Sequence, residues 1–167
     1  MSETTIRRAV LSDGPSLPAV FETAIRKIAS RFYNPDQVNA WAARSHRLQH
    51  VFETDFNARA AWVAEGEDGE IKAYIDLEGG GHIDFFYALP EVSRTTVTAD
   101  MYELLEAEAR VQNVKTLSTE ASEAAKRFFE KRGFFIVARQ DVIINDISIH
   151  NYRMRKDLTT IDFPRDT

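Results

Sequence analysis

Hydrophobic and polar positions change their period several times along this chain, and each change predicts an element. Residues 5–10 have the pattern of a short strand, and Ser12-Asp13-Gly14-Pro15 follows as a turn. From residue 16 onward apolar side chains recur at helical spacing, namely Leu17, Val20, Phe21, Ala24, Ile25 and Ile28. The first part of the chain is therefore expected to form a strand, a turn and a helix over residues 16–31.

A clear start signal for a second helix follows at Asn34. Asn34 suits the N-cap position, Pro35 suits the first helical position, and Gln37 can complete a capping box with Asn34. The sequence predicts a helix from here to about residue 44, with further helical turns between residues 47 and 56.

From residue 60 the period becomes two, which indicates strands. Residues 61–65 and 71–77 are expected to pair as a hairpin across a turn at residues 66–69. Three glycines at positions 79–81 then lead into an apolar strand over residues 82–89, which Pro90 ends.

Helices and strands alternate in the remainder of the chain. The predicted elements are a helix over 98–113, a strand over 115–120, a helix capped by Ser122 and closed by Gly133, and a hairpin of strands 134–144 and 147–156. The order β-α-α-β-β-β-α-β-α-β-β indicates an α/β protein with a mixed sheet.

Composition excludes several kinds of function. The 167-residue chain has no cysteine, so disulfides, thiolate metal sites and cysteine nucleophiles are absent. The formal net charge of -5, without a long basic block, argues against nucleic acid or a membrane surface as a partner. The chain starts without a signal-peptide pattern and has no apolar run near the ~20 residues that span a bilayer, so we expect a cytoplasmic protein. His46, His50 and His150 show no metal-ligand spacing, so they are interpreted as non-functional and no metal is expected.

Several segments, in this order, resemble the GNAT superfamily of N-acetyltransferases. They are Tyr33-x-x-x-Gln37-x-x-x-Trp41, residues 83–91, the Ala-Ser…Phe-Phe-x-x-x-Gly-Phe segment at 121–134, and residues 151–158. The resemblance covers residues 5–158 and implies the GNAT fold, with a mixed central sheet of about seven strands flanked by about four helices. It implies one acetyltransferase domain in residues 1–158, followed by a polar tail at 159–167.

The loop that defines the family departs from its pattern in this chain. GNAT enzymes hold the pyrophosphate of acetyl-CoA with a Gln/Arg-x-x-Gly-x-Gly/Ala loop at a helix N-terminus. An alignment without gaps places Ser93, Thr96 and Thr98 at the glutamine and glycine positions, and a shift by one residue places Arg94, Val97 and Ala99 there. Since glycine tolerates positive φ, a β-branched residue at such a position is disfavoured.

The resemblance implies that acetyl-CoA is the acyl donor, and it assigns contacts to this chain. The predicted cofactor-binding residues are Ala88, Leu89, Arg94, Thr95, Thr96, Val97, Thr98, Ala99, Ser122 and Phe129. The backbone near Ala88 or Leu89 is expected to donate a hydrogen bond to the developing oxyanion. Phe129 stands where the family often has a tyrosine acid, so a proton for the leaving thiolate would come from water or another group.

Candidate acid–base and acceptor residues lie elsewhere in the chain. His82 and Asp84 share one face of their predicted strand, and either could accept the amine proton directly or through water. The alternative is that His82 is exposed and Asp84 is paired or solvated, and Glu120 is a further candidate base. Tyr33 and Trp41 are expected to line the acceptor pocket, the alternatives being a helix staple and a core anchor.

These observations predict an acetyl-CoA-dependent N-acetyltransferase that acts on a primary amine of a small molecule or a protein. The acidic composition favours a cationic acceptor. The alternatives are a non-catalytic GNAT-fold module that binds a ligand or a protein partner, and an enzyme that uses a different acyl-CoA. A homodimer formed through the last hairpin fits the fold, although no residue pattern indicates it.

Overall fold

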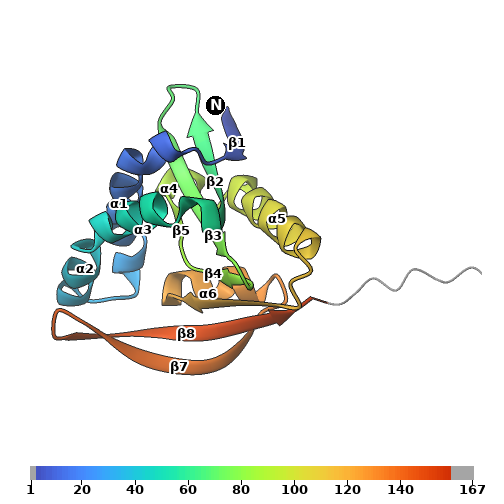
Figure 1. Cartoon of the computed structure of the whole chain (residues 1–167). Helices are drawn as coiled ribbons and strands as arrows, with labels where there is room; N and C mark the ends of the chain where they lie inside the picture. Colours follow the sequence, from blue (N-terminus) through green and yellow to red (C-terminus); the bar gives the residue numbers. More distant parts are fainter. Residues whose placement is uncertain (1–2, 159–167) are drawn as a thin grey trace, which may run out of the picture.

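The computed structural model describes residues 3–158, in which two four-stranded sheets are covered by helices (Figure 1). The strands are β1 (Thr4–Arg8), β2 (Arg59–Gly66), β3 (Ile71–Glu78), β4 (His82–Ile83), β5 (Phe86–Ala88), β6 (Thr116–Ala121), β7 (Phe135–Ile144) and β8 (Ile147–Asp157). The α-helices are α1 (Leu17–Lys27), α2 (Pro35–Ala42), α3 (Ser45–Thr54), α4 (Pro90–Ser93), α5 (Thr96–Val111) and α6 (Glu123–Glu130). Short 3-10 turns occupy Leu11–Ser16, Ala29–Arg31 and Phe56–Ala58.

The first sheet has the antiparallel order β1-β2-β3-β5, and the second has the order β4-β6-β8-β7. In the second sheet β4 runs parallel to β6, and the other pairs are antiparallel. Helices α1, α2 and α3 gather on one side of the first sheet and α5 lies on the other, while the long β7–β8 hairpin runs beneath (Figure 1).

Both faces of the first sheet are buried, because each carries its own hydrophobic cluster. Along β2, Trp62 packs with Met101 and Leu105 of α5, whereas Val63 packs with the cluster of α1 and α3. Alternation along the strand places neighbouring side chains on opposite faces. A sheet covered on both faces reads as nearly continuous apolar sequence, as residues 60–64 do.

The predicted strand over residues 82–89 is broken, and this break separates the two sheets. β4 pairs with β6 at Ile83↔Thr119, whereas β5 pairs with β3 at Ala73↔Ala88. Between them, the fully buried carboxylate of Asp76 accepts the Phe85 N–H at 2.9 Å, and the Asp76 N–H donates to the Phe85 carbonyl at 3.1 Å. The chain therefore leaves one sheet for the other, and β5 diverges from β6.

Other boundaries confirm or correct the sequence predictions. The capping box is confirmed, since Gln37 N–H donates to Asn34 Oδ1 and Asn34 N–H donates to Gln37 Oε1, both at 2.9 Å. The helix expected over residues 16–31 is shorter, because 3-10 turns replace both of its ends. Helix α5 begins at Thr96 instead of residue 98, since the Thr95 hydroxyl caps it by accepting the Val97 N–H at 3.3 Å.

The counts of elements also differ slightly from the prediction. One expected strand becomes β4 and β5, the turns expected between residues 47 and 56 form the full helix α3, and residues 90–93 add α4. Within residues 3–158, no helix has the length and apolar character that a bilayer span needs. The predicted tail at residues 159–167 lies outside the described residues.

Candidate active site

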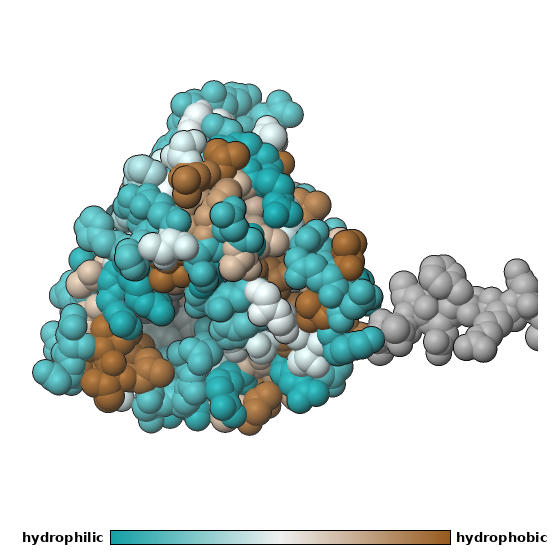
Figure 2. All heavy atoms as spheres, in the orientation of Figure 1, coloured by the Kyte–Doolittle hydropathy of each residue, from teal (hydrophilic) through white to brown (hydrophobic). Residues whose placement is uncertain are grey.

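Two cavities open where β5 and β6 diverge. The larger, of about 260 Å³, lies between the α2–α3 corner, β4, β6 and the β7–β8 hairpin. The smaller, of about 170 Å³, lies between the end of α1, β5 and the starts of α5 and α6. Both are lined by Trp41, Tyr87 and Ser122, so the two cavities meet at these side chains. A hollow is visible above the hairpin, and an apolar patch covers the hairpin's end (Figure 2).

The backbone of β5 has one edge without a strand partner. β5 is the last strand of its sheet, and its inner edge pairs with β3. The Leu89 N–H donates to the Lys72 carbonyl at 2.8 Å, so it is already used. Because successive N–H groups of a strand point to opposite sides, the Ala88 N–H points away from β3, toward the divergence. Of the two backbone donors predicted from the sequence, Ala88 is therefore the one that is free of the β3 ladder.

His82 and Asp84 both line the larger cavity, but their partners differ. Asp84 Oδ2 accepts a hydrogen bond from Arg59 Nη1 at 2.8 Å, so Asp84 forms an ion pair. His82 Nδ1 hydrogen-bonds with Ser118 Oγ at 2.9 Å, across the parallel pair His82↔Ser118. This contact orients the ring, and the Nε2 atom makes no hydrogen bond within residues 3–158. The alternative expectation that Asp84 is paired agrees with the structure, and His82 is half-buried instead of fully exposed.

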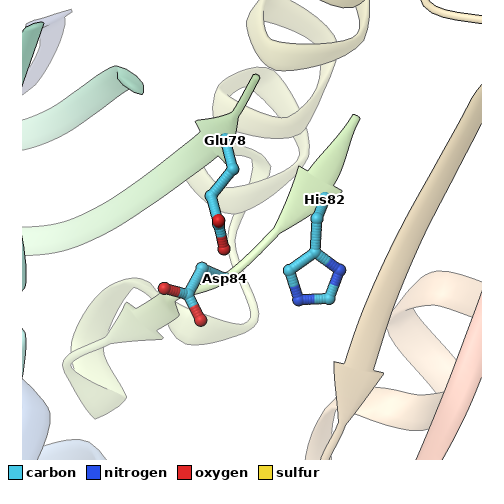
Figure 3. Close-up of side chains that lie close together, drawn as sticks. All are labelled: Glu78, His82 and Asp84. Atoms are coloured by element: carbon cyan, nitrogen blue, oxygen red, sulfur yellow. The ribbon is translucent and has the colours of Figure 1, made fainter. Parts of the chain in front are cut away.

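Glu78, His82 and Asp84 lie close together (Figure 3), and each offers a ligand atom within 4.8 Å of the others. Such a cluster could attract a cation, yet Arg59 already provides a positive charge there. Its guanidinium lies 2.8 Å from Asp84, 3.1 Å from Asp76 and 3.9 Å from Glu78. The side chain of Arg59 is only 6% exposed and is shared by four carboxylates, since Asp55 lies 3.4 Å from it as well.

Tyr33 and Trp41, the predicted acceptor-pocket residues, both line the larger cavity. The buried hydroxyl of Tyr33 also makes a structural contact, because it accepts the Glu123 N–H at 2.8 Å and donates to the His150 carbonyl at 2.9 Å. It thereby connects the N-terminus of α6 with β8. The Trp41 ring lies edge-on to Tyr33, 5.6 Å between centroids, so it joins the core cluster without being fully buried.

Sequence reasoning missed several lining residues. His150, interpreted as non-functional, lines the larger cavity, and its Nε2 lies 2.8 Å from Glu123 Oε2. Burial alone would raise the pKa of Glu123, but hydrogen bonds from Tyr152, His150 and Lys126 outweigh it and lower that pKa to about 2. Only the pairing of hairpin and helix brings these groups together, and no spacing in the sequence shows it.

The α2–α3 corner adds two further missed residues, Arg44 and Arg47, which line the larger cavity. In the sequence these two arginines differ from others only in being three residues apart at the junction between two helices.

A family model described as an acetyltransferase (GNAT) domain matches residues 30–156, which is most of the chain. The chain belongs to the GNAT acetyltransferase family. As a member it is an acetyl-CoA-dependent acyltransferase, and the family requires no metal. Membership favours the enzyme over the non-catalytic binding module.

Proteins described as N-acetyltransferases match this chain over nearly its whole length. The uncharacterized N-acetyltransferase YafP of Escherichia coli (strain K12) is 28% identical over 159 residues, which cover 93% of this chain and 97% of YafP. A GCN5-related N-acetyltransferase structure from Rhodopseudomonas palustris has a TM-score of 0.83 at 27% identity, covering 95% of this chain and 98% of the other. The PaiA N-acetyltransferase of Thermoplasma acidophilum, solved with coenzyme A, has a TM-score of 0.71 at 14% identity, covering 93% and 99%.

The residues predicted to hold acetyl-CoA in this GNAT domain fall into two groups. Those that line the smaller cavity are Ala88, Arg94, Thr98 and Ser122. Those that line neither of the two cavities are Leu89, Thr95, Thr96, Val97, Ala99 and Phe129. Phe129 is 2% exposed and packs against Phe134 at 5.0 Å between ring centroids, as a core residue does.

The residues that stand in place of the GNAT loop glycines cause no strain in the backbone. Among residues 3–158, the non-glycine residues with positive φ are Asn113, Asn145 and Asp146, so none lies between residues 90 and 100. The expectation that a threonine is disfavoured at this point is corrected, because Thr96 and Thr98 stand in the first turn of α5 and not in a left-handed loop. The Thr95 hydroxyl already takes the Val97 N–H, and from this segment only Arg94 and Thr98 of the predicted donor contacts line the smaller cavity.

Proposed function

We propose that the protein transfers the acetyl group of acetyl-CoA to a primary amine bound in the larger cavity. The observation that carries the proposal is the meeting of two cavities at Trp41, Tyr87 and Ser122. The smaller cavity lies against the start of α5 and the unpaired edge of β5, where a helix N-terminus and backbone amides can hold the donor. The coenzyme A bound by PaiA, a protein of the same fold, supports this assignment of the donor.

In this proposal His82 is the general base. The neutral amine attacks the thioester carbonyl, a carbon–nitrogen bond forms, and the carbon–sulfur bond breaks. His82 Nε2 accepts the amine proton, directly or through one water, while Ser118 holds the ring through Nδ1. The Ala88 N–H donates to the carbonyl oxygen as negative charge develops there, and the leaving thiolate takes a proton from water.

Asp84 is the less suitable base of the two. Its Oδ2 already accepts a hydrogen bond from Arg59 Nη1 at 2.8 Å, so this oxygen is occupied by an ion pair. Its role in the proposal is to hold Arg59 and the broken strand in place. Glu120, which is exposed and lines the larger cavity, is available to attract the ammonium form of the acceptor.

Two measurements test the proposal. Calorimetry or thermal unfolding with acetyl-CoA tests the donor, since a ligand at ~100 times its Kd stabilises the fold by roughly 2.7 kcal/mol. Release of free thiol in the presence of amines tests transfer. The absence of stabilisation at millimolar acetyl-CoA would contradict the proposal, and binding without thiol release for any amine would favour the non-catalytic module.

A further inference from the structure

Two exposed arginines line the larger cavity, and neither forms an ion pair within residues 3–158. Arg44 lies between α2 and α3, and Arg47 lies in the first turn of α3. Arg59 and Lys126 nearby, by contrast, are both paired. Since a guanidinium stays charged at every physiological pH, an anion that entered this cavity would meet uncompensated positive charge.

Arg47 stands close to the reacting point. Its guanidinium carbon lies 5.7 Å from the centroid of the Phe85 ring, and Phe85 occupies the break between β4 and β5. Tyr87, where the two cavities meet, is next on the same face and packs 6.3 Å from that ring. Arg47 and Tyr87 line the same cavity, so a group held by Arg47 shares that cavity with the proposed point of acetyl transfer.

The wall of the same cavity formed by β4 and β6 has the complementary chemistry. His82 and Glu120 come from β4 and β6, and the pair His82↔Ser118 places Glu120 on the same face, two residues along β6. Asp84, which lines the same cavity, forms an ion pair with Arg59. An ammonium group is attracted to Glu120, and His82 can take its proton.

We propose that the acceptor is a small amino carboxylic acid, whose carboxylate binds Arg44 and Arg47 while its amine faces His82 and Glu120. This inference rests on the proposed acetyl transfer and names the acceptor class for the same site. Arginine suits the carboxylate because its planar fork matches two oxygens. The cavity volume of about 260 Å³ lies below the range of drug-sized ligand sites, which favours a small acceptor. The charges of the cavity thus oppose the purely cationic acceptor expected from composition.

The test compares acids with their amides. Thiol release from acetyl-CoA is measured with apolar amino acids that differ in the distance between amine and carboxylate, each beside the amide that removes the negative charge. The expected result is a loss of at least about tenfold in kcat/KM on amidation, equal to ~1.4 kcal/mol. Arg44→Gln and Arg47→Gln should each raise KM for the acid by about tenfold and leave KM for the amide unchanged, a factor that again corresponds to ~1.4 kcal/mol.

Controls separate this effect from general damage. Arg8→Gln removes an exposed arginine from β1, a strand that contributes no residue to either cavity, and should change neither KM. Arg47→Lys keeps the charge and should retain part of the preference for the acid. Thermal unfolding of each variant shows whether the fold is intact.

Several outcomes overturn the proposal. Amides that react as fast as acids, arginine variants that affect both alike, or faster reaction with aminoalkyl phosphates would each exclude a carboxylate at this wall. If no amino acid is acetylated while calorimetry shows acetyl-CoA binding, the acceptor class is wrong and the donor assignment remains. If acetyl-CoA itself fails to bind, both the proposed acetyl transfer and the proposed acceptor class are refuted.

Discussion

Tyr33→Phe is the sharpest test of how the α6 N-terminus is held beside the cavities. The substitution keeps the ring, which lines the larger cavity, and removes one oxygen. That oxygen accepts the Glu123 N–H at 2.8 Å and donates to the His150 carbonyl at 2.9 Å. The pairing of β6 with β8 ends at Ala121↔Tyr152, so β6 supplies no hydrogen-bond donor to His150. The Tyr33 hydroxyl donates to the His150 carbonyl instead.

The magnitude follows from the two groups left without a partner. A net hydrogen bond contributes about 0.5–1.5 kcal/mol, and an unsatisfied buried group costs about 1–3 kcal/mol. The carbonyl and the N–H are only partly buried, so water can replace part of each bond. We expect the free energy of unfolding to fall by about 2 kcal/mol, which for a chain of this size lowers Tm by roughly 4–8 °C.

Urea denaturation measures the loss, and Tyr102→Phe is the matched control. The Tyr102 hydroxyl donates to Glu106 at 2.9 Å, and Glu106 keeps its contact with Lys156, so the control leaves no backbone group unpaired. It should lose only about 0.5–1.5 kcal/mol. A Tyr33→Phe variant as stable as the wild type, or no less stable than the control, would refute the structural role assigned to this hydroxyl.

Three further predictions follow from the site. His82→Gln should lower kcat by about 10²–10⁴-fold and leave the Kd of acetyl-CoA unchanged, measured by thiol release and calorimetry; an unchanged kcat would remove His82 as the base. Burial raises the pKa of Asp76 from 3.8 to about 6, so its contribution to the free energy of unfolding is complete below pH 3.8 and is lost as the pH rises through 6. The side chain of Asp76→Asn is neutral throughout, so the free energy of unfolding of this variant, measured by urea titrations between pH 4 and pH 7, should lack this fall. A fall equal to that of the wild type would contradict the prediction. Thr98→Gly should destabilise α5 by about 1 kcal/mol in thermal unfolding, because glycine has a lower helix propensity and the buried methyl group of Thr98 is lost. It should not tighten acetyl-CoA binding, whereas tighter binding would show that the lost glycine matters for the donor.

Local signals predicted much of the fold. The capping box at Asn34, the Ser122 cap that accepts the Ala125 N–H at 3.2 Å, and Gly133 at a φ of 91° are all where the sequence indicates them. Such signals act within a few residues, so one sequence contains all the information needed to find them.

Features that depend on distant residues could not be predicted. The break at Phe85 depends on a buried carboxylate nine residues earlier, and nothing in the apolar run of residues 82–89 marks it. His82 and Asp84 could be placed on one face by alternation, but the arginine that pairs with Asp84 comes from β2, 25 residues away. The arginines of the α2–α3 corner reach the cavity only through packing of helices on the sheet.

The meeting of the two cavities at Trp41, Tyr87 and Ser122 has a consequence for the order of events in turnover. In the proposed reaction, donor and acceptor occupy different cavities that meet at this point, so neither must leave before the other binds. The chain has no cysteine to carry the acetyl group between them. A ternary complex should therefore precede transfer, and initial-rate plots at several fixed acceptor concentrations should intersect instead of running parallel.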